Sequence, residues 1–207
     1  MKQSSLKKYL IILVVVAAAF CAGYLIGGSR IQQVGSFHDI LVNHPKDLRA
    51  LVTPNDERVR TLAARLKTHE AAFAFVRDRI ADDPAAPALP AGEVLADGRA
   101  GCLGKAVLLC SLYRAMGIPP SHVRVVTGEV AYTRGVAEHA WVDMEHDGEC
   151  LQQDATDFLG RFSFDQFRGM EYTRSFIRRE GYVFNDRLFA VVSQLNLLKG
   201  MGHPSMQ

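Results

Sequence analysis

The hydrophobic pattern of this chain changes its period at Pro119-Pro120. Before this pair, apolar residues recur at helical spacing, and after it they fall in short β-branched stretches typical of strands. A run of helices followed by a run of strands is the signature of an α+β domain. The pattern therefore predicts N-terminal helices packed on a small antiparallel sheet.

Three helices are predicted in the first part. Residues 56–66 carry an apolar face at helical spacing, and Thr68 is a suitable cap for the helix that follows. Residues 82–90 are rich in proline and aspartate and break regular structure. The third helix covers residues 102–116 and ends at Gly117 and Pro119.

The second part is predicted to contain three strands and one further helix. The strands cover residues 123–130, 139–145 and 149–153, and Asp147-Gly148 supplies a hairpin turn between the last two. A helix over residues 186–199 is expected to cover the core with Leu188, Phe189 and Val192.

Length and charge exclude some classes of protein. The chain has 207 residues, of which 48% are hydrophobic and 22% charged, which suits one globular domain with short additions. Its formal charge of +2 and the absence of a dense Lys/Arg run beyond the N-terminus argue against nucleic-acid binding.

The N-terminus predicts a membrane anchor. Lys2, Lys7 and Lys8 precede the uncharged residues 9–28, which as a helix would be roughly 30 Å long, about the thickness of a bilayer core. A cleavable signal peptide is the alternative, although the apolar run continues beyond the small residues 17–19. A lipoprotein is disfavoured because Phe20 stands before Cys21.

The lysines before this span predict a cytoplasmic N-terminus, because positive charge is retained on that side. The remainder of the chain would then lie on the periplasmic or extracellular side. The domain organisation that follows is a tip and anchor over residues 1–28, a connector over 29–53, and a folded domain over 54–207.

Cys102 stands where a reactive thiol is expected. It follows Gly101 at the start of the third helix, where unpaired backbone N–H groups and the helix dipole favour thiolate over thiol. Glycines before it permit a tight turn that would leave the sulfur exposed.

Two later residues supply the partners that such a thiol needs. An imidazole at His139 could take the thiol proton and later protonate a departing amine. A carboxylate at Asp154 could fix the tautomer of that imidazole and stabilise its cation. Both lie on predicted strands joined by a short hairpin, so the side chains can be neighbours.

Five short motifs occur in an order that resembles one protein family. They are residues 92–95 (Gly-Glu-Val-Leu), 101–102 (Gly-Cys), 112–119 (Leu-Tyr-Arg-Ala-Met-Gly-Ile-Pro), 139–142 (His-Ala-Trp-Val) and 154–156 (Asp-Ala-Thr). Over about residues 56–157 the chain resembles the transglutaminase-like superfamily, whose fold is related to that of papain. The resemblance implies a nucleophile at Cys102, a base at His139 and an orienting acid at Asp154.

The resemblance leaves the oxyanion site incomplete. The backbone N–H of Cys102 can supply one donor. The Gln or Trp that related enzymes place upstream is absent between Gln33 and Cys102. A backbone N–H near Asp97 or Gly98 is a candidate for the second donor.

Other residues have more ordinary interpretations. Cys110 and Cys150 are expected to pack in the core, with a disulfide between them as an alternative if the domain is exported. Gly101 and Trp141 are candidates for lining a substrate groove, with core packing as the alternative for Trp141. No paired metal-ligand spacing supports zinc, so neither a metal nor an organic cofactor is expected.

The sequence thus predicts a membrane-anchored thiol enzyme that acts on a peptide or protein amide and forms an acyl-thioester at Cys102. Hydrolysis is favoured over cross-linking, because no additional domain is predicted to hold a second protein substrate. The alternative is an inactive relative that holds a protein partner in the same groove or through its C-terminal helix.

Overall fold

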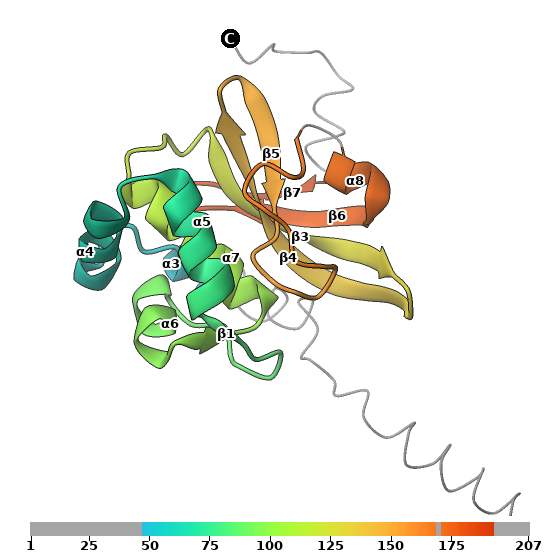
Figure 1. Cartoon of the computed structure of the whole chain (residues 1–207), viewed down its shortest axis with the longest axis horizontal. Helices are drawn as coiled ribbons and strands as arrows, with labels where there is room; N and C mark the ends of the chain where they lie inside the picture. Colours follow the sequence, from blue (N-terminus) through green and yellow to red (C-terminus); the bar gives the residue numbers. More distant parts are fainter. Residues whose placement is uncertain (1–46, 169–170, 193–207) are drawn as a thin grey trace, which may run out of the picture. The chain divides into compact units, whose positions relative to one another are not determined.

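A five-stranded antiparallel sheet and the helices packed against it make up residues 47–168 and 171–192, the part of the chain that the computed structural model describes (Figure 1). The helices come first and the main strands begin at Val123, so the predicted order of elements is confirmed. Residues 9–28, predicted to anchor the chain, lie outside the described residues. Among the described residues, no helix is long and apolar enough to span a bilayer.

The elements are as follows. The helices are α3 (Asp47–Leu51), α4 (Glu57–Leu66), α5 (His69–Arg79), α6 (Ala91–Asp97), α7 (Cys102–Ala115) and α8 (Glu171–Ser175). The strands are β1 (Ala81–Asp82), β2 (Arg99–Ala100), β3 (Val123–Tyr132), β4 (Gly135–His146), β5 (Glu149–Gln153), β6 (Ile177–Phe184) and β7 (Phe189–Val191).

Side-chain caps begin the two helices of the first pair. The carboxylate of Asp56 accepts from the backbone N–H groups of Arg58 and Val59 at the start of α4. Thr68 Oγ1 accepts from the Ala71 N–H at 3.2 Å, so the predicted cap of α5 is confirmed. The short helix α6 was not predicted, and it ends at Gly98, whose φ of +67° favours glycine.

The helix α7 is enclosed on all sides. Each residue from Leu103 to Tyr113 is buried, including the polar Lys105 and Ser111, because α4, α5 and α6 surround it on one side and β3 and β4 on the other. A helix in this position needs no amphipathic stripe. Its N-terminal residue, Cys102, is only partly buried.

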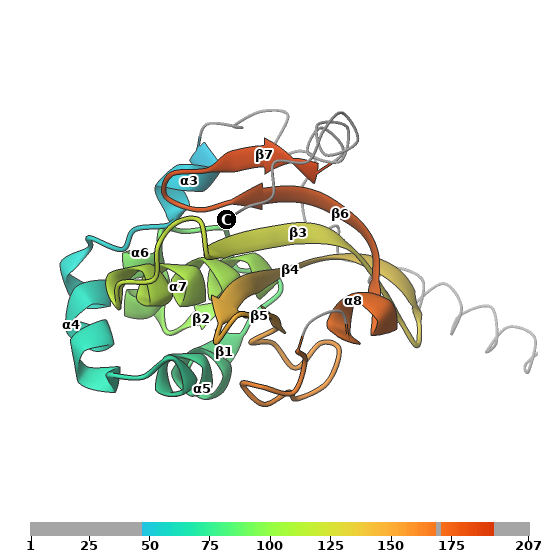
Figure 2. The same ribbon diagram turned by 90° about the horizontal axis from the view of Figure 1, so that it is seen from above.

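The large sheet has the strand order β5-β4-β3-β6-β7, and Figure 2 shows the strands in this sequence from above. The predicted hairpin turn is confirmed, because Asp147 and Gly148 both have positive φ, 52° and 78°. Alternate residues face two different clusters. Val125 and Val142 pack with the helices, whereas Val126 and Trp141 pack with Tyr172 of α8 on the other face.

The C-terminal part of the domain differs from the prediction. Strand β6 was not predicted, and the expected helix over residues 186–199 is wrong where the structure describes it, because Phe189–Val191 forms β7. Phe189 pairs with Phe184, and Val191 pairs with Tyr182. Pairing with β6 therefore determines the structure of this segment, although its apolar residues have helical spacing. The residues after 192 lie outside the described range.

Gly128 of β3 lets strand β6 pass close to β3 at the position opposite His139, the predicted base. It stands opposite His139 in the β3–β4 register, at a point where the β3–β6 register shifts. A Cβ atom at this position would lie 2.2 Å from the carbonyl oxygen of Arg179, so only glycine lets β6 pass.

Candidate active site

Cys102 opens α7 in a setting that suits an anion. Gly101 is the N-cap residue and supplies no side-chain hydrogen bond, and the first turn contains no acidic residue. The first N–H groups of a helix have no intrahelical acceptor, so they remain available beside the Cys102 sulfur. The position predicted from the sequence is thus confirmed for this residue.

The two glycines before Cys102 act differently from one another. Gly98 has positive φ and allows the turn out of α6, as expected. Gly101 is extended, with φ of −75°, so its role is not conformational. A Cβ on Gly101 would lie 3.3 Å from the carbonyl oxygen of Asp83, so its small size lets the loop after β1 pass close to the residue before Cys102.

His139 and Asp154 are brought together by the end of β5. The β4–β5 pairing extends only from His146↔Glu149 to Val142↔Gln153, and the chain then turns away at Asp154. Asp154 is therefore placed beside the adjoining stretch of β4, where its Oδ2 lies 2.7 Å from His139 Nε2. The side chains of both residues are almost completely buried.

The Asp154 carboxylate has further donors besides the imidazole. Tyr172 donates its hydroxyl to Oδ2 at 3.0 Å. The backbone N–H and the hydroxyl of Thr156 donate to Oδ1 at 2.9 and 2.7 Å. A buried carboxylate with donors on both oxygens is stabilised as the anion.

The charges of the pair reinforce each other. Burial alone lowers the pKa of His139, but the charge and hydrogen bond of Asp154, together with a hydrogen bond to Cys102, raise it from 6.5 to about 10. Burial alone raises the pKa of Asp154, but His139 and Thr156 hold it below its usual value. Burial and the charge of Asp154 raise the pKa of Tyr172, so that hydroxyl remains a donor.

The hydrogen bonds assign the two imidazole nitrogens. Since Asp154 is an anion and accepts at Nε2, that nitrogen carries hydrogen. The Nδ1 atom makes no contact with Asp154 and is the nitrogen available to the Cys102 thiol, which helps to raise the pKa of the imidazole. The arrangement can move a proton from sulfur to Nδ1 while the cation formed stays paired with Asp154.

Phe158 is a site residue that the sequence did not indicate. Its ring stacks on the His139 imidazole, with the ring centroids 5.2 Å apart, and it also lies 4.9 Å from the ring of Tyr132. Phe158 is nevertheless 46% exposed. Neither Phe158 nor Tyr172 stands out in the sequence, because each is brought to the pair by a loop or helix distant from β4.

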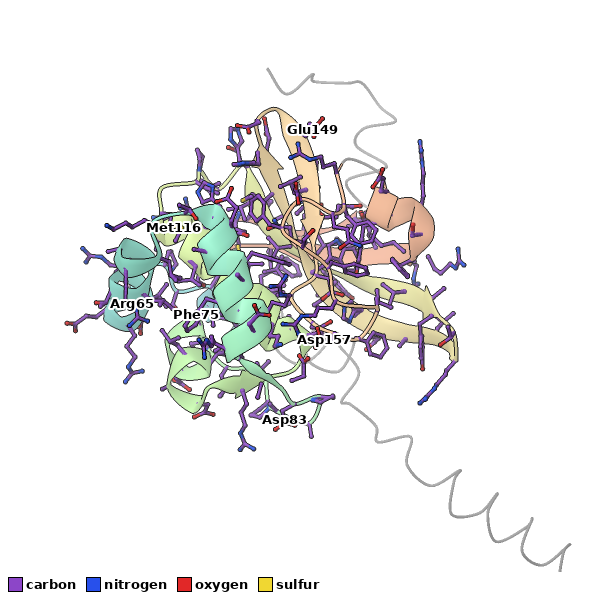
Figure 3. All side chains as sticks on the ribbon, in the orientation of Figure 1. Arg65, Phe75, Asp83, Met116, Glu149 and Asp157 are labelled. Atoms are coloured by element: carbon purple, nitrogen blue, oxygen red, sulfur yellow. The ribbon has the colours of Figure 1, made fainter. Side chains whose placement is uncertain are left out.

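Lys105 connects the helix of Cys102 with the loop of Asp154. Its Nζ atom lies 2.7 Å from Asp82 of β1 and donates to the carbonyl oxygen of Ala155 at 3.2 Å. Asp82 also accepts a hydrogen bond from the backbone N–H of Asp157. Figure 3 labels Asp157 on the loop after β5 and Asp83 on the loop after β1. A lysine inside an apolar helix was the available signal, and it was missed.

Several predicted roles need correction. Trp141 is fully buried against Tyr172 and donates its indole N–H to Asp143, so it does not line a groove. Cys150 is exposed rather than in the core, and it and the buried Cys110 are free thiols, so the alternative of a disulfide between them is excluded.

The proposed second oxyanion donor at Gly98 is not available, because its N–H donates to the Val94 carbonyl. Two hollows, of about 820 and 380 Å³, lie along α4, and the lining of the larger includes Arg60 and Met116 rather than any predicted site residue. Within the described ranges, no group of three or more His, Cys, Asp or Glu side chains could hold a metal ion.

A known protein family matches about half of the chain. Residues 48–150 match the family model of the transglutaminase-like superfamily. The chain carries a transglutaminase-like domain. Strands β6 and β7 lie beyond the matched residues, as do Asp154, Thr156 and Tyr172, so the acidic half of the pair is identified by its contacts.

The transglutaminase-like domain is also similar to solved structures. LapG of Legionella pneumophila in its calcium-bound form is 15% identical, with a TM-score of 0.46 over 75% of this chain and 98% of that one. A candidate cysteine protease from Cytophaga hutchinsonii is 16% identical, with a TM-score of 0.43 over 70% and 55%. Among curated proteins, none matches the sequence significantly.

Proposed function

We propose that this protein is a thiol-dependent amide acyl-transfer enzyme in which Cys102, His139 and Asp154 form the catalytic triad. The observation that carries the proposal is the 2.7 Å contact between His139 Nε2 and Asp154 Oδ2, together with the influence of Cys102, which helps to raise the pKa of the same imidazole. Burying ionisable side chains costs free energy unless they are paired, and buried pairs with perturbed pKa values are concentrated at functional sites.

The proposed reaction has two halves, the formation of a thioester on Cys102 and its breakdown, and each group of the triad acts in both. The thiol proton passes to His139, and the Cys102 sulfur attacks the carbonyl carbon of a peptide or glutamine-like amide. The C–N bond then breaks, and the imidazolium returns the proton to the departing nitrogen. The acyl group remains on sulfur as a thioester until water or an amine attacks it. The N–H of Cys102 faces the developing oxyanion.

Hydrolysis is the favoured second half of the reaction. The described residues form one α+β domain, built from helices, the five-stranded sheet and the short β1–β2 pair, with no separate domain to hold a second protein. Water needs no such support, whereas cross-linking requires a bound amine. We therefore propose a peptidase or amidase rather than a cross-linking enzyme.

The site is further proposed to lie outside the cytoplasm. The apolar residues 9–28 and the lysines before them support a single anchor with a cytoplasmic N-terminus. A peptide or protein substrate would then meet the domain at the outer face of that membrane.

Trapping of the acyl-enzyme tests the activity. The full chain is incubated with a library of peptide amides, quenched in acid, and digested to locate a mass adduct, which is expected on Cys102 and absent from Cys102→Ser. Repeated absence of an adduct on Cys102 would favour the alternative, a domain that only holds a protein partner.

Thiol labelling provides a second measurement with internal controls. Iodoacetamide at pH 6 is expected to modify Cys102 faster than Cys110 or Cys150, because only Cys102 has an imidazole partner. Burial raises the pKa of the Cys110 thiol far above its usual value. Partial desolvation and the charge of Asp143 raise the pKa of the surface thiol Cys150 to about 12. Equal labelling of the three thiols would contradict an activated Cys102.

A further inference from the structure

The aromatic contact on His139 continues outward to a second ring. Phe158 stacks on the imidazole with an angle of 26° between the planes, and the ring of Tyr132 contacts Phe158 with an angle of 49° between the planes. We refer to Phe158 and Tyr132 as the aromatic pair. Tyr132 ends β3 at the β3–β4 hairpin, and Phe158 lies on the loop after β5, so two separate segments build the pair.

The aromatic pair is held in register with the catalytic carboxylate. The backbone N–H of Phe158 donates to Thr156 Oγ1 at 3.3 Å, and the same hydroxyl donates to Asp154 at 2.7 Å. The turn that satisfies Asp154 therefore also positions the Phe158 ring. Its position is set by the site and not by burial in the core.

Exposure is the unusual property of Phe158. Apart from Val136 and Leu188, it is the only exposed large hydrophobic side chain among the described residues, and it is the one in contact with the predicted base. An aromatic ring left in water at such a place forgoes the stabilisation that burial would provide. A ligand side chain that covers it would recover that stabilisation.

The proposed chemistry tells which side of the substrate reaches this ring. His139 delivers its proton to the departing nitrogen, so that nitrogen lies at the imidazole when the C–N bond breaks. The acyl side is bonded to the sulfur of Cys102 at the start of α7. The residue that contributes the nitrogen is therefore the one nearest to Phe158.

We propose that the aromatic pair is a subsite for an apolar or aromatic side chain on the amine component of the substrate, the residue directly after the cleaved bond. The proposal rests on the proposed acyl transfer and adds a substrate class to it. Ring contacts of this kind contribute enough to be seen as a several-fold preference. An amine that attacks the thioester would dock in the same subsite, because the reverse step passes through the same arrangement.

The first experiment measures preference at this position. Peptides with one constant acyl side and Phe, Leu or Gly after the cleaved bond are compared by kcat/KM in the full chain. The Phe/Gly ratio is expected to exceed one and to fall about 3- to 10-fold in Tyr132→Ala. Tyr132→Phe keeps the ring and should restore the ratio, whereas Val136→Ala, on the same hairpin, is the control. An unchanged ratio in Tyr132→Ala overturns the proposal.

The second experiment does not depend on turnover. The full chain carrying Cys102→Ala is titrated with phenylalanine amide and with glycine amide, and binding is followed by ligand-observed NMR. The phenylalanine compound should bind at least about threefold more tightly, and Tyr132→Ala should remove the difference. Equal binding of both amides contradicts the subsite. Selective binding in this variant, combined with no adduct on Cys102 when the unmutated chain is tested by acyl-enzyme trapping, would support the subsite and contradict the acyl transfer.

Discussion

The Asp154 carboxylate accepts from His139, Tyr172 and Thr156 although no solvent reaches it. Each donor stabilises the anion, and the anion in turn stabilises a charged imidazole. At the scale of single residues, the site is thus a buried charge pair whose remaining hydrogen-bonding capacity is filled by neighbouring side chains. Two predictions follow from this balance.

Asp154→Asn is expected to lower the rate of acyl-enzyme formation by about 10- to 1000-fold. An amide carries no charge for the imidazolium, and its NH₂ group cannot accept from Tyr172 or His139. Asp157→Asn is the matched control, because its half-exposed side chain pairs with Arg161 at the surface. A loss of activity in Asp157→Asn with none in Asp154→Asn would show that the acid had been misassigned.

The stability of the domain should depend on pH through the same pair. The raised pKa of His139 provides stabilisation that is complete below pH 6.5 and is lost as the pH rises towards about 10. The lowered pKa of Asp154 stabilises the folded state when the pH is above the usual pKa of an aspartate, and this stabilisation is lost as the pH falls. The free energy of unfolding, measured with urea across this pH range, should decline on the alkaline side. In His139→Gln this decline should be smaller.

At the scale of elements, the start of one helix meets the end of one strand pair. The N-terminus of α7 supplies Cys102, and the point where β5 leaves β4 supplies Asp154 beside His139. Lys105 links these elements by its contacts with Asp82 and Ala155. This contact fixes the distance between the thiol and the loop that carries the acid.

Lys105→Met should therefore destabilise the domain and slow acylation. Removal of one partner from a buried ion pair is costly, but the Asp82 side chain is 40% exposed and can be hydrated, so we expect about 1–3 kcal/mol. Arg179→Met is the control, since its pair with Glu129 is on the surface and should contribute about 0–1 kcal/mol. Equal effects of the two variants on the free energy of unfolding would refute a buried link at Lys105.

At the scale of the whole molecule, the helices seen in Figure 1 contribute the proposed nucleophile, whereas strand β4 and the loop after β5 contribute the proposed base and acid. The proposed triad therefore forms only when the helices and the sheet are packed together. The proposed anchor, residues 9–28, would tether this domain to a membrane.

The anchor can be tested on the complete chain. A reporter fused after Gln207 is expected to be active only on the non-cytoplasmic side, because lysines precede the apolar run and keep the N-terminus inside. N-terminal sequencing of the purified protein should begin at Met1 or directly after it. A mature terminus near Phe20 would instead indicate a cleaved signal peptide, and a cytoplasmic reporter would reverse the orientation.

The sequence alone was sufficient for features that depend on neighbouring residues. The cap at Thr68, the start of α7 at Cys102 and the turn at Asp147-Gly148 follow from local hydrogen bonds and backbone preferences, and the structure confirms them. The order of helices and strands follows from the period of apolar residues. The types of residue needed for thiol chemistry were also visible in the chain.

Only the tertiary structure decided which distant groups complete the site. Tyr172 contacts Asp154, Phe158 contacts His139, and Lys105 contacts Ala155. The two residues of each contact are separated in sequence, and no local pattern encodes such contacts. The burial of Trp141 and the strand at Phe189–Val191 have the same cause, because pairing and packing across the sheet outweigh local preference.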